Sequence, residues 1–217
     1  MQETTTKEKV LKKVRDALVN AMPVPYEGVD LDSPVIRTPG GDFREEAFAG
    51  AFNRTGGKFV YCPGAGDMAR GISTLIAEKK VAKLFCRESF LSDLLTEMGI
   101  DHEGDPANIH HCDAAITACE ALVVRHGSIV FSSGQESGRK SFVAAPLHIV
   151  VATNQQMVDD LAGAFRFLKA KYGQDMPSFV TFVSGPSRTA DIEKTLVHGA
   201  HGPKELYLFM LDTLEQA

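Results

Sequence analysis

Apolar, β-rich runs alternate with helix-periodic segments along most of this chain, and this alternation restricts the folds open to it. The apolar runs lie at residues 58–62, 83–86, 114–119, 121–124, 128–131, 146–152, 179–183 and 205–211. Segments with apolar residues at helical spacing lie among them, at residues 44–52, 67–79, 89–98 and 155–171. Because near-continuous apolar strands separated by helices are typical of a sheet covered on both faces, the sequence predicts an α/β fold. The crowded runs between Ala114 and Phe131 indicate an antiparallel or irregular excursion from that sheet.

The amino-terminal part of the chain has a different character. Residues 7–20 carry apolar side chains at helical spacing and charges at the other positions. Residues 22–41 contain four prolines, which favour an extended connector over a helix or a strand. We therefore expect residues 1–42 to form an arm that packs on the domain or on a partner, and residues 43–217 to form one α/β domain. A chain of 217 residues is long enough to bury a substantial core.

Net charge and hydropathy exclude several classes of partner. The formal net charge of −5 and the pI near 5.8 imply no large basic surface, so we expect neither nucleic acid nor an anionic membrane as a partner. No apolar run approaches the length of a membrane span. The first residues are charged and lack the apolar stretch of a signal peptide, so we expect a cytoplasmic protein.

The cysteines give no sign of a metal site. Cys62, Cys86, Cys112 and Cys119 form no C-x-x-C pair, so motifs for iron–sulfur clusters and zinc are poorly supported. We expect free thiols in a reducing compartment, and neither a metal nor a cofactor bound by this chain itself.

The loop after the run at residues 179–183 combines several features of an anion site. It reads S-G-P-S-R-T-A-D-I-E over residues 184–193, and helical spacing follows it. A turn between a strand and a helix gathers unpaired backbone N–H groups at the positive end of the helix dipole, and the hydroxyls and the guanidinium add donors. The ligand-binding residues predicted here are Ser184, Gly185, Ser187, Arg188 and Thr189. The alternative is an ordinary cap of the following helix.

A second polar loop, residues 132–140, contains glycines, hydroxyls and two adjacent cations. This composition suits recognition of an anionic group, and we predict that Gly134, Gln135 and Arg139 contact the ligand. We expect Arg139 to converge with Arg188. The alternative is a solvated hairpin tip.

His201 and the loop at residues 61–67 are further candidates. His201 lies in a His-Gly-Pro turn, where it could bind the ligand or fix the turn. Residues 61–67 lack the third glycine of G-x-G-x-x-G and so indicate a dinucleotide only weakly. The catalytic residue stays unknown: Glu120, Cys62 and His201 are candidates, none of them with a visible partner.

The carboxyl-terminal motifs resemble those of the LUD, or lactate-utilisation, domain family, specifically its small protein C type. The matching segments are G-P-S-R-T-A-D-I-E at residues 185–193 and G-A-H-G-P at residues 199–203, followed by the final apolar run. Central segments also agree, at residues 116–120, 127–130, 138–139 and 146–149. The resemblance covers roughly residue 43 to the carboxyl terminus.

This resemblance implies a Rossmann-like, three-layer α/β/α open sheet of the NagB/RpiA/CoA-transferase-like type, preceded by the helical arm. It also implies a role in oxidising L-lactate to pyruvate beside partner subunits that carry iron–sulfur clusters, with electron transfer left to those partners. One position departs from the family, because Arg125 stands where relatives commonly have an acidic residue. If that carboxylate acts in relatives, this chain cannot act in the same way.

The leading interpretation is an accessory subunit of a cytoplasmic L-lactate oxidation system that binds a small anionic ligand at strand-end loops. The alternative is a stand-alone enzyme or binding module acting on a small phosphorylated or CoA-linked metabolite, by analogy with other members of the fold group. Turnover by the isolated chain would favour the enzyme. Activity only in a reconstituted complex would favour the subunit, and ligand binding without turnover would favour the module.

Overall fold

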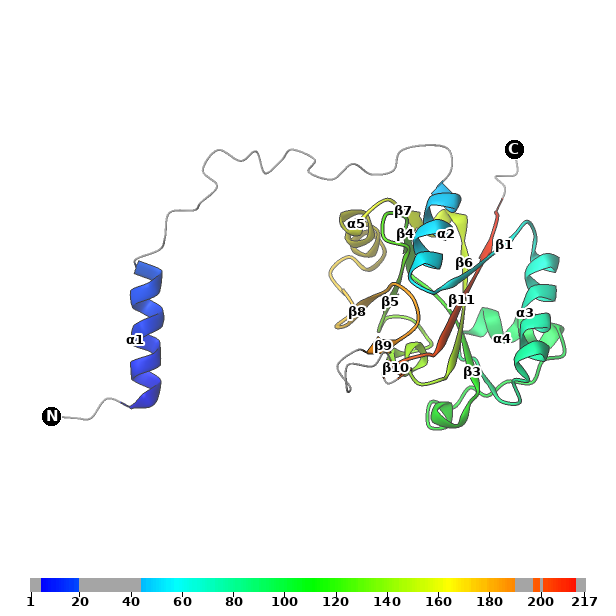
Figure 1. The fold of residues 1–217 in the computed structure, drawn as a ribbon, viewed down its shortest axis with the longest axis horizontal. Helices are drawn as coiled ribbons and strands as arrows, with labels where there is room; N and C mark the ends of the chain where they lie inside the picture. The colour runs from blue at the N-terminus through cyan, green and yellow to red at the C-terminus, as the bar shows by residue number, and fades with distance from the viewer. Residues whose placement is uncertain (1–4, 20–43, 190–196, 200, 214–217) are drawn as a thin grey trace. The chain divides into compact units, whose positions relative to one another are not determined.

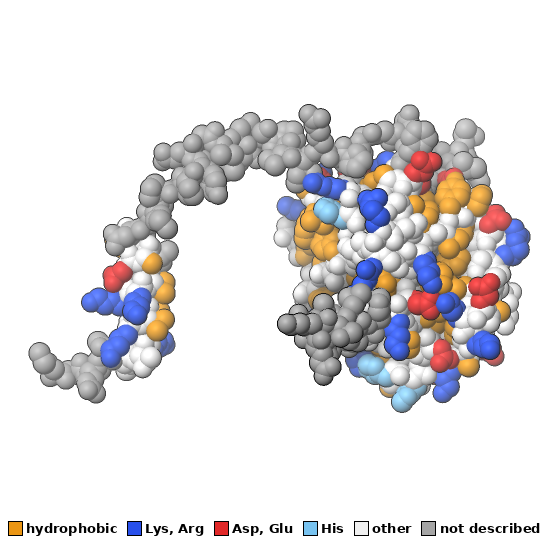
Figure 2. Space-filling model, in the orientation of Figure 1, with side chains coloured by type: hydrophobic (Ala, Val, Ile, Leu, Met, Phe, Trp, Pro, Cys, Tyr) orange, Lys and Arg blue, Asp and Glu red, His pale blue; other side chains and the backbone are white. Residues whose placement is uncertain are grey.

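The computed structural model describes residues 5–19, 44–189, 197–199 and 201–213. The chain divides into two units, Met1–Arg37 and Thr38–Ala217. In the first unit, helix α1 spans Thr6–Val19, as the helical spacing predicts. The Glu8 carboxylate accepts a hydrogen bond from the Thr5 backbone N–H at 2.8 Å, which caps the helix start. Figure 2 shows hydrophobic side chains along one side of this helix and Lys and Arg along another.

At the centre of the second unit, the described strands form a sheet of five parallel strands (Figure 1). In sheet order they are β1 (Lys58–Cys62), β11 (Glu205–Leu211), β6 (Leu147–Thr153), β3 (Ala114–Ala118) and β2 (Leu84–Phe85). β11, the last of them along the chain, pairs in parallel with both β1 and β6. Strands β3 and β6 are buried along almost their whole length, which explains why their sequences are continuously apolar.

Helices α3 (Ala65–Lys79) and α4 (Ser89–Glu97) cover one face of this sheet (Figure 1). Ile149 and Val151, at alternate positions of β6, pack on this face with Ile72 of α3 and Leu91 of α4. All four side chains are buried. Burial of this apolar surface holds the two helices on the sheet.

A second, smaller sheet and helix α2 (Arg44–Arg54) cover the other face. The small sheet has the order β7 (Met157–Val158), β4 (Ala121–Val123), β5 (Ser128–Ser132) and β8 (Val180–Val183), with β5 antiparallel to both of its neighbours. Leu122 and Ile129 pack in the core that it shares with Val150 of the main sheet. Helix α5 (Leu161–Tyr172) packs on its outer face through Ala164 and Leu168.

A mostly parallel sheet flanked by helices confirms the predicted α/β class. The excursion predicted between Ala114 and Phe131 is confirmed as the β4–β5 hairpin. The layering is richer than α/β/α, because this hairpin places a second sheet between the main sheet and α5 (Figure 1). Strand alternation explains the extra layer: Leu122 packs toward the main sheet, whereas Ala121 and Val123 pack toward α5.

Two predicted helices differ from the structure. Val197, the last apolar residue of the predicted helical spacing, lies instead in β10 (Val197–His198), which pairs antiparallel with β9 (Arg188–Thr189). Ile192 and its neighbours in residues 190–196 lie outside the described residues. Helix α5 begins at Leu161 rather than at residue 155, because the Asp160 carboxylate caps it by accepting a hydrogen bond from the Gly163 N–H at 2.7 Å.

Three short 3-10 helices complete the described elements: η1 (Ile109–His111), η2 (Arg139–Phe142) and η3 (Asn154–Gln156). None of the described helices has the length and the hydropathy needed to cross a bilayer.

Candidate functional site

A cavity of about 170 Å³ lies beyond the carboxyl end of β2, between that strand and η2. The residues that line it are Phe85, Arg87, Pro106, Ile109, Ser137, Gly138, Arg139, Lys140 and Ser141. The position agrees with the general rule that ligands of open α/β sheets bind outside the carboxyl ends of the strands. We call this space the cationic cavity.

The described lining of the cationic cavity carries positive charge and no carboxylate. Arg87, Arg139 and Lys140 all contribute to it, and none of the three forms an ion pair with a described residue. Arg139 Nη2 donates a hydrogen bond to Ser178 Oγ at 2.7 Å, and its guanidinium lies 5.6 Å from the centre of the Phe179 ring. Guanidinium and ammonium groups without carboxylate partners favour an anionic ligand.

The rest of the wall is apolar or hydroxylic. Phe85 and Ile109 are fully buried and belong to one apolar cluster. Ser137 and Ser141 are also buried, and the Ser141 hydroxyl donates to the Ser137 carbonyl oxygen. The cavity therefore suits a small ligand that combines a negative charge with a short apolar part.

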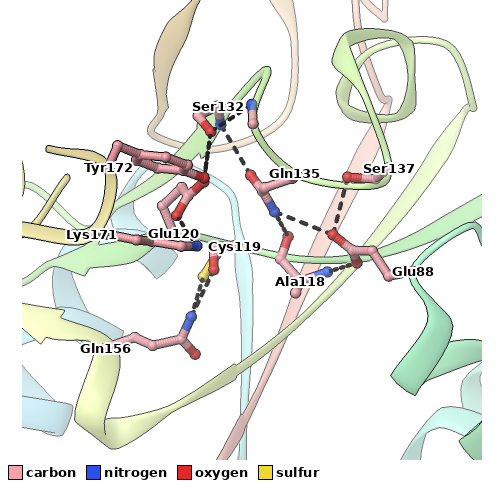
Figure 3. Close-up of polar contacts among 11 residues, drawn as sticks. Glu88, Ala118, Cys119, Glu120, Ser132, Gln135, Ser137, Gln156, Lys171 and Tyr172 are labelled. Atoms are coloured by element: carbon pink, nitrogen blue, oxygen red, sulfur yellow. Dashed lines mark hydrogen bonds and ion pairs between the residues drawn. The ribbon is translucent and has the colours of Figure 1, made fainter. Parts of the chain in front are cut away.

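The buried carboxylate of Glu88 supports the cavity wall through a hydrogen bond from Ser137 (Figure 3). Ser137 Oγ donates to Glu88 Oε1 at 3.1 Å, and the Ala118 N–H donates to Glu88 Oε2. Burial raises the pKa of the Glu88 carboxyl, although the hydrogen bonds from Ala118, Ser137 and Gln135 act in the opposite direction. The Glu88 carboxylate thus links the end of β3 to the loop that carries Ser137.

Gln135 is a structural bridge in the same network (Figure 3). Its Nε2 donates to the Ala118 carbonyl at 3.0 Å and to Glu88 Oε1 at 3.3 Å. Its Oε1 accepts a hydrogen bond from the Ser132 N–H at 3.0 Å. Since both ends of this amide are bonded internally, Gln135 positions the loop, and it does not line the cationic cavity.

Glu120 forms a second buried carboxylate centre beside the first (Figure 3). Its Oε1 accepts hydrogen bonds from Ser132 Oγ and Tyr172 Oη, both at 2.6 Å, and its Oε2 pairs with Lys171 Nζ at 2.7 Å. Burial alone would raise the pKa of Glu120, but the three donors and the charge of Lys171 bring it below its ordinary value. The Tyr172 ring lies against Gly134, where a Cβ would come within 2.6 Å of the hydroxyl.

The predicted Ser184 loop is separate from the cationic cavity. Ser184 Oγ forms a hydrogen bond of 2.6 Å with Ser128 Oγ. Gly185 adopts a φ of +116°, and a Cβ there would come within 2.6 Å of the Thr55 carbonyl oxygen. The backbone of Thr189 pairs with Val197 in the β9–β10 ribbon. None of these residues lines the cationic cavity.

Arg139 and Arg188, which we expected to converge, have different partners in the structure, and Arg188 does not line the cationic cavity. Arg139 contacts Ser178, which precedes β8, whereas Arg188 follows β8 and lies over Gly56, where a Cβ would come within 2.4 Å of its Nη2.

The candidate catalytic residues also lie apart. His201 is exposed and lines a different cavity, and Glu120 is fully engaged in its own contacts. Cys62 is buried, and burial, followed by the charge of Asp67, raises the pKa of its thiol.

Arg125 lies in the β4–β5 turn, where its N–H donates to the Asp159 carbonyl at 3.1 Å. Among the described residues, no group of three His, Cys, Asp or Glu side chains could hold a metal ion.

Sequence reasoning missed Arg87, Glu88 and Ser137. Arg87 and Glu88 directly follow the apolar run of β2, so the strand-end rule could have identified them. Tyr172 and Lys171 lie at the end of a helix distant in the sequence, and nothing local marks their pairing with Glu120.

The fold defines this unit as an α/β protein with a mostly parallel sheet flanked by helices. Residues 106–211 match the LUD domain family, so the predicted resemblance to the lactate-utilisation family is confirmed for this part of the chain.

Curated relatives agree with this assignment. The chain is similar to lactate utilization protein C of Halalkalibacterium halodurans, with 33% identity over 119 residues that cover 53% of this chain and 52% of that protein. It is also similar to lactate utilization protein C 1 of Bacillus mycoides, with 31% identity over 52% of this chain and 49% of that protein. The chain therefore spans about half the length of these relatives.

A solved structure supports the fold. The crystal structure of a DUF162 family protein from Deinococcus radiodurans superposes with a TM-score of 0.58 and 15% identity. It covers 77% of this chain and 96% of its own length. This likeness shows the shared fold alone.

Proposed function

We propose that this chain acts in lactate utilisation, as an accessory subunit of a cytoplasmic system that oxidises L-lactate to pyruvate. The names of the relatives support the pathway. The observation that carries the binding role is the cationic cavity, whose described lining has three cations and no carboxylate. Redox chemistry is assigned to partner subunits with iron–sulfur clusters, and this chain holds a small anionic ligand for them.

The cavity has the complementary chemistry for a short 2-hydroxy or 2-oxo acid. A ligand carboxylate would lie near the guanidinium groups of Arg87 and Arg139, which match it in shape and charge. Ser137 Oγ, which donates to Glu88, keeps lone pairs that can accept a hydrogen bond from a ligand hydroxyl. The apolar wall of Phe85 and Ile109 would contact a methyl group. A volume of about 170 Å³ is below the usual 300–1,000 Å³ of drug-sized sites and so favours a small ligand.

Calorimetric titration of the purified chain with L-lactate and with pyruvate tests the binding role. We expect Arg139→Gln to weaken binding by about tenfold, because a charge-assisted hydrogen bond contributes about 1.5–3 kcal/mol and part of this is screened at an exposed site. Arg70→Gln on α3, an exposed arginine paired with Asp67 away from the cavity, is the matched control and should leave affinity unchanged. Equal affinity in Arg139→Gln and the unaltered chain would refute the assignment of the cavity.

The subunit role needs a test in the native host. The tagged chain should co-purify with cluster-bearing proteins, and lactate-dependent dye reduction should disappear when this chain is removed. Undiminished lactate oxidation without the chain would exclude the subunit role. Turnover of a phosphorylated or CoA-linked metabolite by the isolated chain would instead establish the enzyme interpretation.

A further inference from the structure

A second cavity, of about 370 Å³, lies where β6 and β11 begin, and it borders the cationic cavity along η1 and the segment that follows η2. The residues that line it are His110, Val143, Ala144, Ala145, Pro146, Gly199, His201, Gly202 and Lys204. Its volume lies within the range usual for sites that bind small molecules. It includes the His-Gly-Pro turn, which the cationic cavity does not use.

Backbone hydrogen bonds fix the walls of this second cavity. The Ser187 N–H donates to the Pro203 carbonyl and the Gly199 N–H donates to the Ser187 carbonyl, both at 2.9 Å. The Lys204 N–H donates to the Pro146 carbonyl at 2.8 Å. The turn that carries His201 is therefore held between β9 and the start of β6.

Glycine at position 199 sets the course of the Lys204 side chain. Gly199 has a φ of +76°, a conformation that glycine adopts at little cost. A Cβ there would lie 2.4 Å from Cγ of Lys204, so the lysine stem packs directly on the glycine. This contact directs the aliphatic part of Lys204 along the cavity wall.

The donors in this wall match a phosphoryl group. The described lining offers the Lys204 ammonium and the imidazoles of His110 and His201, and it contains no carboxylate. Lys204 forms no ion pair with a described residue. A phosphoryl group carries about −1.5 to −2 charges and three acceptor oxygens, and lysine binds it as a point charge.

We propose that the second cavity binds a small phosphorylated metabolite through Lys204, His110 and His201. The described linings of the two cavities share no residue, and this proposal does not depend on the proposed role of the cationic cavity. The volume leaves room for an organic part beside the phosphoryl group, against Val143 and Pro146.

Titration of the full chain with inorganic phosphate and with glycerol 3-phosphate tests the proposal, followed by calorimetry and by NMR of the imidazole protons. We expect both probes to bind, and the resonances of His110 and His201 to shift while those of the buried His148 stay unchanged. Lys204→Gln should lower the affinity for both probes by at least tenfold, and His201→Gln should lower it by about threefold or more. Both side chains are exposed, so the variants should keep the thermal midpoint of the unaltered chain.

Lys169→Gln, an exposed lysine on α5, is the matched control and should leave phosphate affinity unchanged. Absence of binding, equal affinity in Lys204→Gln and Lys169→Gln, or loss of phosphate binding in Arg139→Gln alone would each overturn the proposal. Retention of L-lactate affinity in Lys204→Gln would show that the two cavities act separately, so failure at one site is distinguishable from failure at the other.

Discussion

Glu120 is a charged side chain placed where water does not reach, and its contacts explain why it is tolerated there. Its carboxylate is 1% exposed and receives donors from the end of β5 and the end of α5. Removing one partner of a buried ion pair leaves the other charge uncompensated, which typically costs about 3–5 kcal/mol. Lys171 is half-exposed, so it can recover solvent contacts that Glu120 cannot.

A double-mutant cycle on Glu120 and Lys171 follows from this asymmetry. We expect Glu120→Gln to lower the free energy of unfolding by about 3 kcal/mol and Lys171→Met by about 1–2 kcal/mol. The double variant should lose less than the sum, with a coupling of about 1–2 kcal/mol. Lys169→Met, an exposed lysine on the same helix, should change stability by less than about 0.5 kcal/mol. Chemical denaturation measures all four, and strict additivity would show that the pair has no coupling.

The pH dependence of the same variants has a defined sign. Because the pKa of Glu120 is lowered in the folded chain, its contribution is fully present above the ordinary carboxyl value near 4.5 and is lost as the pH falls through the lower folded value. The stability difference between the unaltered chain and Glu120→Gln should therefore shrink below pH 4.5. A stability difference that stays constant down to pH 3 would show that the pKa of Glu120 does not contribute to folding in this way.

At the scale of elements, the β4–β5 turn docks on helix α2 through a glycine. Gly127 has a φ of +60°, and a Cβ there would lie 2.3 Å from the Phe52 backbone nitrogen. This close approach lets the small sheet and α2 share one core, in which Phe52 and Ile129 are both buried. A backbone contact of this kind has no flexible atom that can move aside.

Comparison of two glycine variants isolates that contact. Gly127→Ala combines the cost of a positive φ with a backbone clash, and we expect it to lower the free energy of unfolding by about 3 kcal/mol. Gly99 has a φ of +68° and open space around it, so Gly99→Ala should cost about 1 kcal/mol from the backbone alone. Thermal and chemical unfolding measure the difference. An equal loss of unfolding free energy in Gly127→Ala and Gly99→Ala would show that α2 moves away from the turn freely.

Periodicity predicted β1, β3, β6 and β11 within about a residue, because apolar residues dominate each of these runs and β3 and β6 are buried almost throughout. Of the helical spacing expected after the Ser184 loop, Val197 is described, and it lies in strand β10 instead. Its pairing with Thr189 of β9 is a contact that local spacing does not reveal.

The candidate site was only partly predictable. Arg139 lines the cationic cavity, as the composition of its loop suggested. Gly134 and Gln135 belong to the supporting network instead, since their partners are Glu88 at the N-cap of α4, Ala118 of β3 and Tyr172 of α5. Which polar groups meet depends on how the second sheet packs on the first, and no single segment encodes that arrangement.

For the whole molecule, the packing predicts that residues 44–217 fold without the arm. Every buried core cluster in the described part of the chain is built from residues after Arg44. We expect removal of residues 1–42 to shift the thermal midpoint by less than about 3 °C, which corresponds to about 1 kcal/mol in a domain of this size. A large drop, or loss of a cooperative transition, would show that the arm supplies core contacts.

The place of β11 between β1 and β6 has a consequence for how the protein is made. β1 and β11 pair side by side, although Lys58 and Tyr207 are 149 residues apart along the chain. The ribosome therefore synthesises β1, β2, β3 and β6 before β11, the strand that joins β1 to β6. Until β11 emerges, both strands present open edges that can pair with other chains. Completion of the domain is thus expected only after residue 211 has been synthesised, and nascent chains shorter than residue 205 should be substrates for chaperones.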